Sequence, residues 1–197
     1  MNDRYFLIAS IIWGIWVTSW WIAAFWSKSG FARANRSSYW IYLVIAALGF
    51  FCIFFRPTPV RHPLGLLHPL WLLPPWLGWT MVGLVAASVA FAWWARIHLG
   101  VLWSSGVGRA EDHRIVDTGP YALVRHPIYT SLIAAAAATA VLQATPIALG
   151  GAVLIALGFG LKARVEERFL SHELGEEDYA AYRARVPMLM PFAPAAR

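Results

Sequence analysis

Residues 119–129, GPYALVRHPIY, form the stretch around which the rest of the chain is organised. Pro120 fixes its own φ, and Pro127 disfavours helical geometry at the residue before it but is well tolerated in the first turn of a helix. We therefore expect Arg125 and His126 on a shaped turn, with a helix beginning at or just after Pro127. The turn places ionisable side chains directly before a long apolar run, so we expect the chemistry here.

The composition is that of a membrane protein. Of the 197 residues, 59% are hydrophobic and 13% are charged, and the mean hydropathy is +0.57. The chain also carries 12 tryptophans, a residue that collects at membrane interfaces. We therefore expect a single integral membrane domain over residues 1–197.

Five apolar runs indicate membrane-spanning helices, each of which needs about 20 mostly apolar residues. They are residues 5–26, 39–55, 76–94, 128–142 and 146–161. Three residues separate the last two runs, which predicts a tight helical hairpin. The expected fold class is all-α, a polytopic membrane protein with about five transmembrane helices and a C-terminal helical hairpin.

The net charge of +6 would suggest nucleic-acid binding in a soluble protein, but here the cations lie in loops between apolar runs. Most Lys and Arg residues fall after the first run, after the third run and in the C-terminal tail. The positive-inside rule then predicts the N-terminus outside and the C-terminus in the cytoplasm. We expect a multi-pass protein of a bacterial inner membrane, with the lipid bilayer as its partner and no nucleic acid.

Beyond the fifth run the sequence becomes amphipathic. We predict that the helix of this run continues out of the membrane and breaks near Gly175, and that a second helix covers residues 176–185. Glu166 and Glu167 are expected at the depth of the 119–129 turn. Adjacent helical positions point in different directions, so the two acids cannot form a carboxylate dyad. One can face a pocket while the other pairs with a cation, and a plain Arg164–Glu167 salt bridge is the alternative.

Several familiar chemistries are excluded by the residues present. Cys52 is the only cysteine, so an internal disulfide and a cysteine zinc site are both ruled out. The histidines lack the HxxxH and HxxHH spacings of membrane di-iron oxidases, and no P-loop or GxGxxG motif occurs. We expect no metal site.

An ordered set of motifs in the C-terminal half resembles the isoprenylcysteine carboxyl methyltransferase family. Phospholipid methyltransferases share its RHP and EE elements, and an ordered set is more specific than any one piece. Members often have a glycine after the RHP tyrosine, where Thr130 and Ser131 stand here. The matching residues are Leu99-Gly100 with Trp103-Ser104, His113-Arg114, Gly119-Pro120-Tyr121, Val124-Arg125-His126-Pro127 with Tyr129, and Glu166-Glu167 with Leu170, Gly175, Tyr179 and Tyr182.

The resemblance implies a membrane methyltransferase that uses S-adenosyl-L-methionine from the cytoplasm. Its acceptor would be a lipophilic small molecule, a lipid or a prenylated substrate, and a carboxylate is one option, as in isoprenylcysteine O-methylation. Residues 1–75 would then supply the N-terminal spans and a loop, and residues 76–197 the cofactor-binding core with its cytoplasmic pocket.

The site residues implied by the resemblance gather at the turn and at the paired acids. Backbone N–H groups of the turn, with Arg125 and His126, would hold the cofactor's carboxylate. A carboxylate acceptor is already ionised at neutral pH and needs only an orienting cation, whereas an amine or thiol would need a base. The catalytic candidates are Glu167, Arg164 and Arg125; the cofactor-binding candidates are Tyr121, Val124, Arg125, His126, Pro127, Tyr129, Glu166 and Glu167.

Two other functions compete with methyl transfer. Membrane sterol reductases resemble the same C-terminal half but use NADPH, which requires a basic site for the extra phosphate that the sequence does not locate. A non-enzymatic transporter or assembly protein with this fold is the third possibility, and it would tolerate loss of His126 and Glu167.

Overall fold

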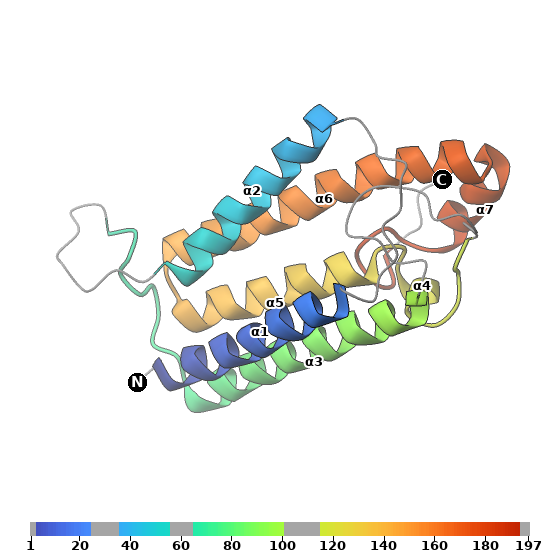
Figure 1. Ribbon diagram of the computed structural model, residues 1–197. Coiled ribbons are helices and arrows are strands. Elements are labelled where there is room, and N and C mark those ends of the chain that lie inside the picture. The colour runs from blue at the N-terminus through green and yellow to red at the C-terminus, as the bar shows by residue number, and fades with distance from the viewer. Residues whose placement is uncertain (1–2, 25–35, 56–64, 101–114, 194–197) are drawn as a thin grey trace.

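A computed structural model of the chain describes residues 3–24, 36–55, 65–100 and 115–193. Every regular element within these ranges is a helix, which confirms the all-α prediction. The helices, shown in Figure 1, are α1 (Asp3–Ala24), α2 (Arg36–Phe54), α3 (Pro75–Leu99), α4 (Pro120–Leu123), α5 (Pro127–Gln143), α6 (Pro146–Leu174) and α7 (Glu176–Arg185).

All five predicted apolar runs form helices, and together they make a polytopic bundle. Three of these helices are long and apolar enough to cross a membrane, over Asp3–Ala23, Pro75–Leu99 and Pro146–His172. Two shorter apolar helices, Trp40–Phe54 and Pro127–Gln143, complete the set. Large apolar side chains remain exposed on the outer faces of α1, α2 and α6, as lipid contact requires. The direction in which the bundle crosses the membrane stays a prediction.

The helices α2, α6, α5 and α3 pack in this spatial order, and α1 packs against both α3 and α5 (Figure 1). The central helix, α5, is rich in alanine, and most of its small side chains are buried, with α3 and α6 packed against it. Trp13 of α1 reaches α5 as well, where its indole N–H donates to Thr139 Oγ1 at 3.1 Å. The C-terminal half of the chain therefore forms the centre of the bundle.

Glycines set the distance between α2 and α6. A Cβ added at Gly151 would lie 2.7 Å from the Gly49 carbonyl oxygen, and one at Gly158 would lie 3.0 Å from the Ala46 backbone nitrogen. Both glycines belong to α6 and face α2, and small residues at such positions let two membrane helices approach closely.

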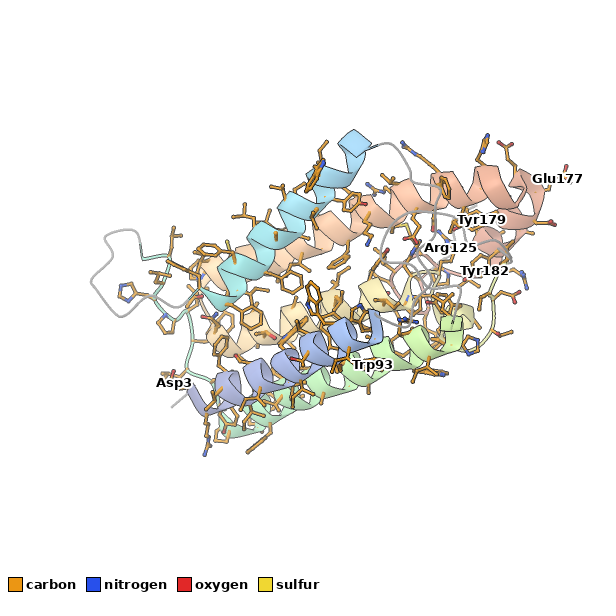
Figure 2. All side chains as sticks on the ribbon, viewed as in Figure 1. Asp3, Trp93, Arg125, Glu177, Tyr179 and Tyr182 are labelled. Carbon is orange, nitrogen blue, oxygen red and sulfur yellow. The ribbon has the colours of Figure 1, made fainter. Side chains whose placement is uncertain are left out.

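The polar residues gather at one end of the bundle. Figure 2 shows Arg125, Tyr179 and Tyr182 at this end, far from Asp3 at the start of α1. The helix of the fifth run ends at Leu174, Gly175 adopts a φ of +95°, and α7 begins at the next residue, as predicted. A positive φ is readily adopted by glycine, so the chain can turn sharply and bring α7 back toward the site.

Candidate functional site

The turn before α5 has the shape that its prolines predict. Val124 and His126 have extended or irregular backbone, and α5 begins at Pro127. The backbone N–H groups of Arg125 and His126 donate to the carbonyls of Pro187 and Met188 at 2.9 and 3.1 Å. These two donors are therefore already paired with the segment that follows α7. That the turn holds a cofactor carboxylate stays a prediction.

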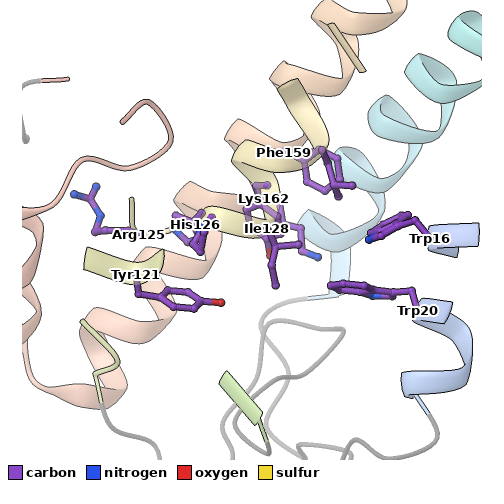
Figure 3. A pocket seen from close by; sticks show the side chains of 11 residues that line it. Trp16, Trp20, Tyr121, Arg125, His126, Ile128, Phe159 and Lys162 are labelled. Carbon is purple, nitrogen blue, oxygen red and sulfur yellow. The ribbon is translucent and has the colours of Figure 1, made fainter. Parts of the chain in front are cut away.

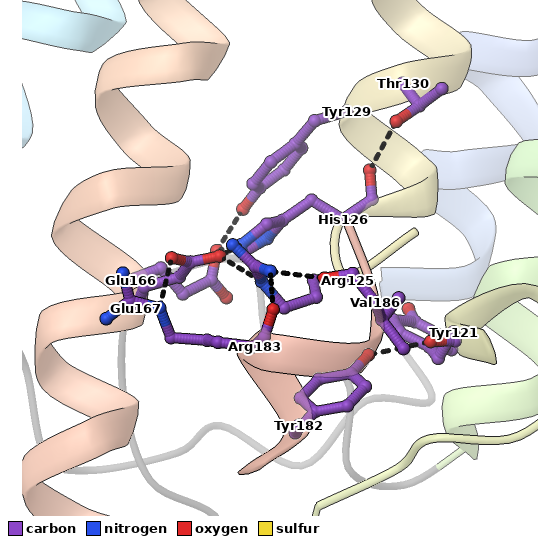
Figure 4. Close-up of polar contacts among 10 residues, drawn as sticks. All are labelled: Tyr121, Arg125, His126, Tyr129, Thr130, Glu166, Glu167, Tyr182, Arg183 and Val186. Atoms are coloured by element: carbon purple, nitrogen blue, oxygen red, sulfur yellow. Dashed lines mark hydrogen bonds and ion pairs between the residues drawn. The ribbon is translucent and has the colours of Figure 1, made fainter. Parts of the chain in front are cut away.

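Arg125 connects the turn to both α6 and α7 (Figure 4). Its Nε–H donates to Glu167 Oε1 at 2.6 Å. Another guanidinium nitrogen donates to the carbonyls of Arg183, at 3.1 Å, and Val186. Only 5% of Arg125 and 6% of Glu167 is exposed, so this is a buried, charge-assisted contact of the strong kind.

Both glutamates reach the turn, each through its own partners. His126 Nε2 lies 3.2 Å from Glu167 Oε1, and its Nδ1 lies 3.8 Å from Glu166 Oε2. The Tyr129 hydroxyl donates to Glu166 Oε2 at 2.6 Å. Successive side chains on a helix point in different directions, so Glu166 and Glu167 do not form a carboxylate pair. The His126 ring lies between the two acids and is near both. The Arg164–Glu167 pairing is not adopted, because the Glu167 carboxylate binds Arg125.

Arg183 is a contributor that the sequence analysis missed. Its Nε lies 3.7 Å from Glu167 Oε2, so α7 supplies a second cation to this acid. Tyr182 fixes α7 in place by donating its hydroxyl to the Tyr121 carbonyl at 2.8 Å. Burial raises the pKa of Tyr182 and of Tyr121, which keeps both phenols protonated at neutral pH.

An aromatic stack extends from the turn into the bundle. The rings of His126 and Tyr129 lie parallel with centroids 5.3 Å apart, and Phe159 stacks on Tyr129 at 5.2 Å. Lys162 Nζ lies 5.1 Å from the Tyr129 ring centroid. Neither Phe159 nor Lys162 was predicted as a site residue, although Phe159, Lys162 and Glu166 follow one another at spacings of three and four residues, which marks one helical face.

A cavity of about 180 Å³ lies beside this stack (Figure 3). One end is polar and belongs to the turn, whereas the other is apolar and includes two tryptophans of α1. That α1 takes part is a second feature that the sequence analysis missed. The lining residues are Trp16, Trp20, Tyr121, Arg125, His126, Pro127, Ile128, Tyr129, Leu132, Phe159 and Lys162.

The predicted site residues divide into three groups. Tyr121, Arg125, His126, Pro127 and Tyr129 line the cavity. Glu166 and Glu167 stand behind the lining and bind it, and Val124 is fully buried in the turn.

Arg164 belongs to none of these groups, because its side chain is exposed and does not line the cavity. The motif residues Trp103, Ser104, His113 and Arg114 lie outside the described part of the chain. Thr130, where a glycine is common in the resembling family, donates its hydroxyl to the Leu189 carbonyl at 2.6 Å. It therefore adds a third link between the start of α5 and the segment after α7.

Comparison with known proteins agrees with the motif pattern. Residues 81–172 match the model of the isoprenylcysteine carboxyl methyltransferase (ICMT) family. Over these residues the chain is similar to that family. The ICMT segment includes the RHP turn and both glutamates, but it leaves out α1 and α7. Trp16, Trp20 and Arg183 therefore join the site from outside the matched segment.

Three relatives illustrate the match. The chain is 33% identical over 87 residues to protein-S-isoprenylcysteine O-methyltransferase B of Arabidopsis thaliana, covering 44% of each chain. It is 34% identical over 85 residues to protein-S-isoprenylcysteine O-methyltransferase of Xenopus laevis, covering 43% of this chain and 29% of that one. The cobalt-zinc-cadmium resistance protein CzcN of Cupriavidus metallidurans is 30% identical over 122 residues, covering 61% of this chain and 51% of that one. The chain thus spans about half or less of the length of these relatives.

Among the described residues, no group of three or more His, Cys, Asp or Glu side chains is placed to hold a metal ion. The acids nearest the cavity are instead paired with arginine, histidine and tyrosine.

Proposed function

We propose that the protein is an S-adenosyl-L-methionine-dependent methyltransferase that acts on a lipophilic, membrane-associated acceptor. One observation carries the proposal: the Arg125–Glu167–His126 network borders an aromatic cavity inside an apolar helical bundle. The match to the ICMT family and the names of two relatives support this choice over a reductase or a transporter.

The residues around the cavity fit the charges of S-adenosyl-L-methionine. The faces of Tyr129 and Phe159 suit a sulfonium cation and an adenine ring, because aromatic faces attract cations and stack on planar groups. Glu166 is not part of the lining, but it is the more accessible of the two acids, since 26% of its side chain is exposed against 7% for Glu167. We assign Glu166 to the amino or ribose hydroxyl groups of the cofactor.

Arg125 and Glu167 are positioning residues in this proposal. The guanidinium is engaged by the Glu167 carboxylate and by two carbonyls near the end of α7. The pair therefore fixes the His126 ring and the α7 segment around the cavity. A rigid shell of this kind keeps bound groups in a reactive alignment, which supplies much of the acceleration of a two-substrate reaction.

S-adenosyl-L-methionine supplies a methyl group on a positively charged sulfonium. When bound, it would transfer this methyl group to an acceptor nucleophile, and the electron pair of the carbon–sulfur bond that breaks would remain on sulfur. The apolar walls formed by Leu132 and Phe159 exclude water, which favours loss of the positive charge. A carboxylate acceptor gives a methyl ester with no proton transfer, so the chain needs to orient it and not to deprotonate it.

Calorimetry with the purified protein in detergent tests the cofactor. We expect binding of S-adenosyl-L-methionine and of S-adenosylhomocysteine, and no competition by NADPH. Glu166→Gln should weaken binding about tenfold, because a hydrogen bond to a charged group is lost. Arg164→Gln, on the same helix but exposed, is the matched control and should bind normally. Binding of NADPH in place of both ligands would point to the reductase.

A further inference from the structure

The chain that follows α7 carries an exposed apolar turn. Residues 190–192, Met-Pro-Phe, all lie on the surface, and 71% of Met190 and 95% of Phe192 is exposed. The Ala193 N–H donates to the Met190 carbonyl at 3.2 Å, which closes the turn, and Phe192 has a φ of +63°. Bulky residues rarely adopt a positive φ, which glycine adopts without strain. Two large apolar side chains presented by such a turn indicate an apolar partner outside the chain.

The turn is held level with the start of α5. Backbone hydrogen bonds join residues 187 and 188 to the RHP turn, and the Leu189 carbonyl accepts the Thr130 hydroxyl at 2.6 Å. Thr130 belongs to the apolar helix α5 and lies about 4.5 Å along the helix axis from its first residue. Figure 1 shows the chain after α7 returning to this end of the bundle. Met190 and Phe192 therefore lie near the level at which an apolar helix of the bundle begins, where hydrocarbon meets headgroups.

The neighbouring elements also expose apolar side chains at this end of the bundle. Trp94 and Ile97, in the last turns of α3, are 47% and 70% exposed, and Leu123 of α4 is 40% exposed. Both α3 and α5 pack against α4. Tryptophan in particular collects at membrane interfaces. The apolar turn thus continues the lipid-facing surface of the bundle.

The charges of α7 are ordered to suit an anionic membrane surface. Its last turn holds Arg183 and Arg185, directly before the apolar turn. Each contacts an acid, but 45% and 65% of the two side chains stay exposed. The acidic residues of α7 lie in its first turn, and Glu177 is about 12 Å from Arg185 along the helix axis. Cations next to a membrane surface are attracted by anionic headgroups.

We propose that the turn of residues 190–193 inserts into the interface of an anionic bilayer. Met190 and Phe192 lie among the upper acyl chains, and Arg183 and Arg185 lie at the headgroups. Apolar residues flanked by cations are typical of segments that lie in a membrane interface. This lipid-binding surface is separate from the cavity and does not depend on the proposed methyl transfer. The same segment binds the RHP turn, so backbone hydrogen bonds join the lipid contact to the cavity wall.

Spin labels test this placement. Cys52 is the only cysteine, so the full chain with Cys52→Ala takes one nitroxide at Met190→Cys or at Phe192→Cys. The protein is placed in nanodiscs of equal parts phosphatidylcholine and phosphatidylglycerol. Collisions of the label with oxygen, which concentrates in lipid, are compared with collisions with a water-soluble nickel chelate. We expect both labels to lie about 5–10 Å into the headgroup–acyl boundary. In phosphatidylcholine alone, the ratio of inserted to detached turn should fall at least about tenfold, because two arginines lose their attraction.

Leu157→Cys and Glu177→Cys are the matched references. Leu157 is 55% exposed on α6 and should report lipid, whereas Glu177 is exposed at the acidic start of α7 and should report water. The two references also show that the labelled protein is folded in the nanodisc. Nickel collisions as frequent at residues 190 and 192 as at 177 overturn the inference. Shielding of the turn from both reagents, as by a second copy of the chain, overturns it as well, and so does equal insertion in the two lipids.

Discussion

Replacing Arg125 with Met should release α7 from the bundle while the transmembrane helices stay folded. The change removes the contact of 2.6 Å to Glu167 and the contacts to the Arg183 and Val186 carbonyls. It leaves the Glu167 carboxylate buried, with Arg183 at 3.7 Å as the remaining arginine. Breaking a buried ion pair by removing one partner costs about 3–5 kcal/mol.

This cost should appear locally, because α7 is held by few other contacts. Its small core consists of Tyr179, Tyr182 and Val186, packed against Ile115 and Leu170. Amide hydrogen exchange followed by mass spectrometry measures the opening of residues 176–186 directly. A loss of 3–5 kcal/mol corresponds to exchange that is faster by about two to four orders of magnitude, with α3 and α5 unchanged.

Arg185→Gln is the control for the Arg125 variant. Its ion pair with Asp117, at 3.2 Å, joins α7 to the same region but is exposed, and such pairs contribute at most about 1 kcal/mol. Exchange in this variant should stay within about fivefold of the wild type. If Arg125→Met exchanges no faster than the control, Arg125 does not hold α7 and the positioning role is refuted.

Two further predictions concern packing and pH. Gly151→Ala should lower the melting temperature, because its Cβ would lie 2.7 Å from the Gly49 carbonyl and overpacking costs about 1–3 kcal/mol. Gly150→Ala is the control: its Cβ would meet open space, so this variant should melt at the same temperature as the wild type. The buried Tyr182 phenol, whose pKa is raised in the folded state, should contribute full stability to α7 docking below pH of about 10 and lose it as the pH rises further. Amide hydrogen exchange in α7 should therefore accelerate above that pH in the wild type, and its pH dependence should be weaker in Tyr182→Phe. An identical pH profile in the two proteins would contradict a stabilising role of the Tyr182 phenol.

The helices could be predicted because their signals are local. Apolar runs of membrane-spanning length, Pro127 at the start of α5 and Gly175 after α6 each act on the residues around them. The proximity of the RHP turn to Glu166 and Glu167 was expected from a shared depth and from motif order. Their individual partners were not, because a pair 41 or 42 residues apart leaves no periodic trace in the sequence.

The sequence by itself determined the class of the protein, the presence of its five long helices and of the helix after Gly175, and the residue types at its polar end, since these follow from hydropathy and from proline and glycine geometry. It did not predict the short helix α4. Tertiary structure alone decided which faces meet. On a helix each residue turns the side chain by about 100°, so Arg164 points outward while Lys162, Glu166 and Glu167 turn inward. The rotation of α1 likewise decided that Trp16, more than 100 positions before the RHP turn, completes the cavity.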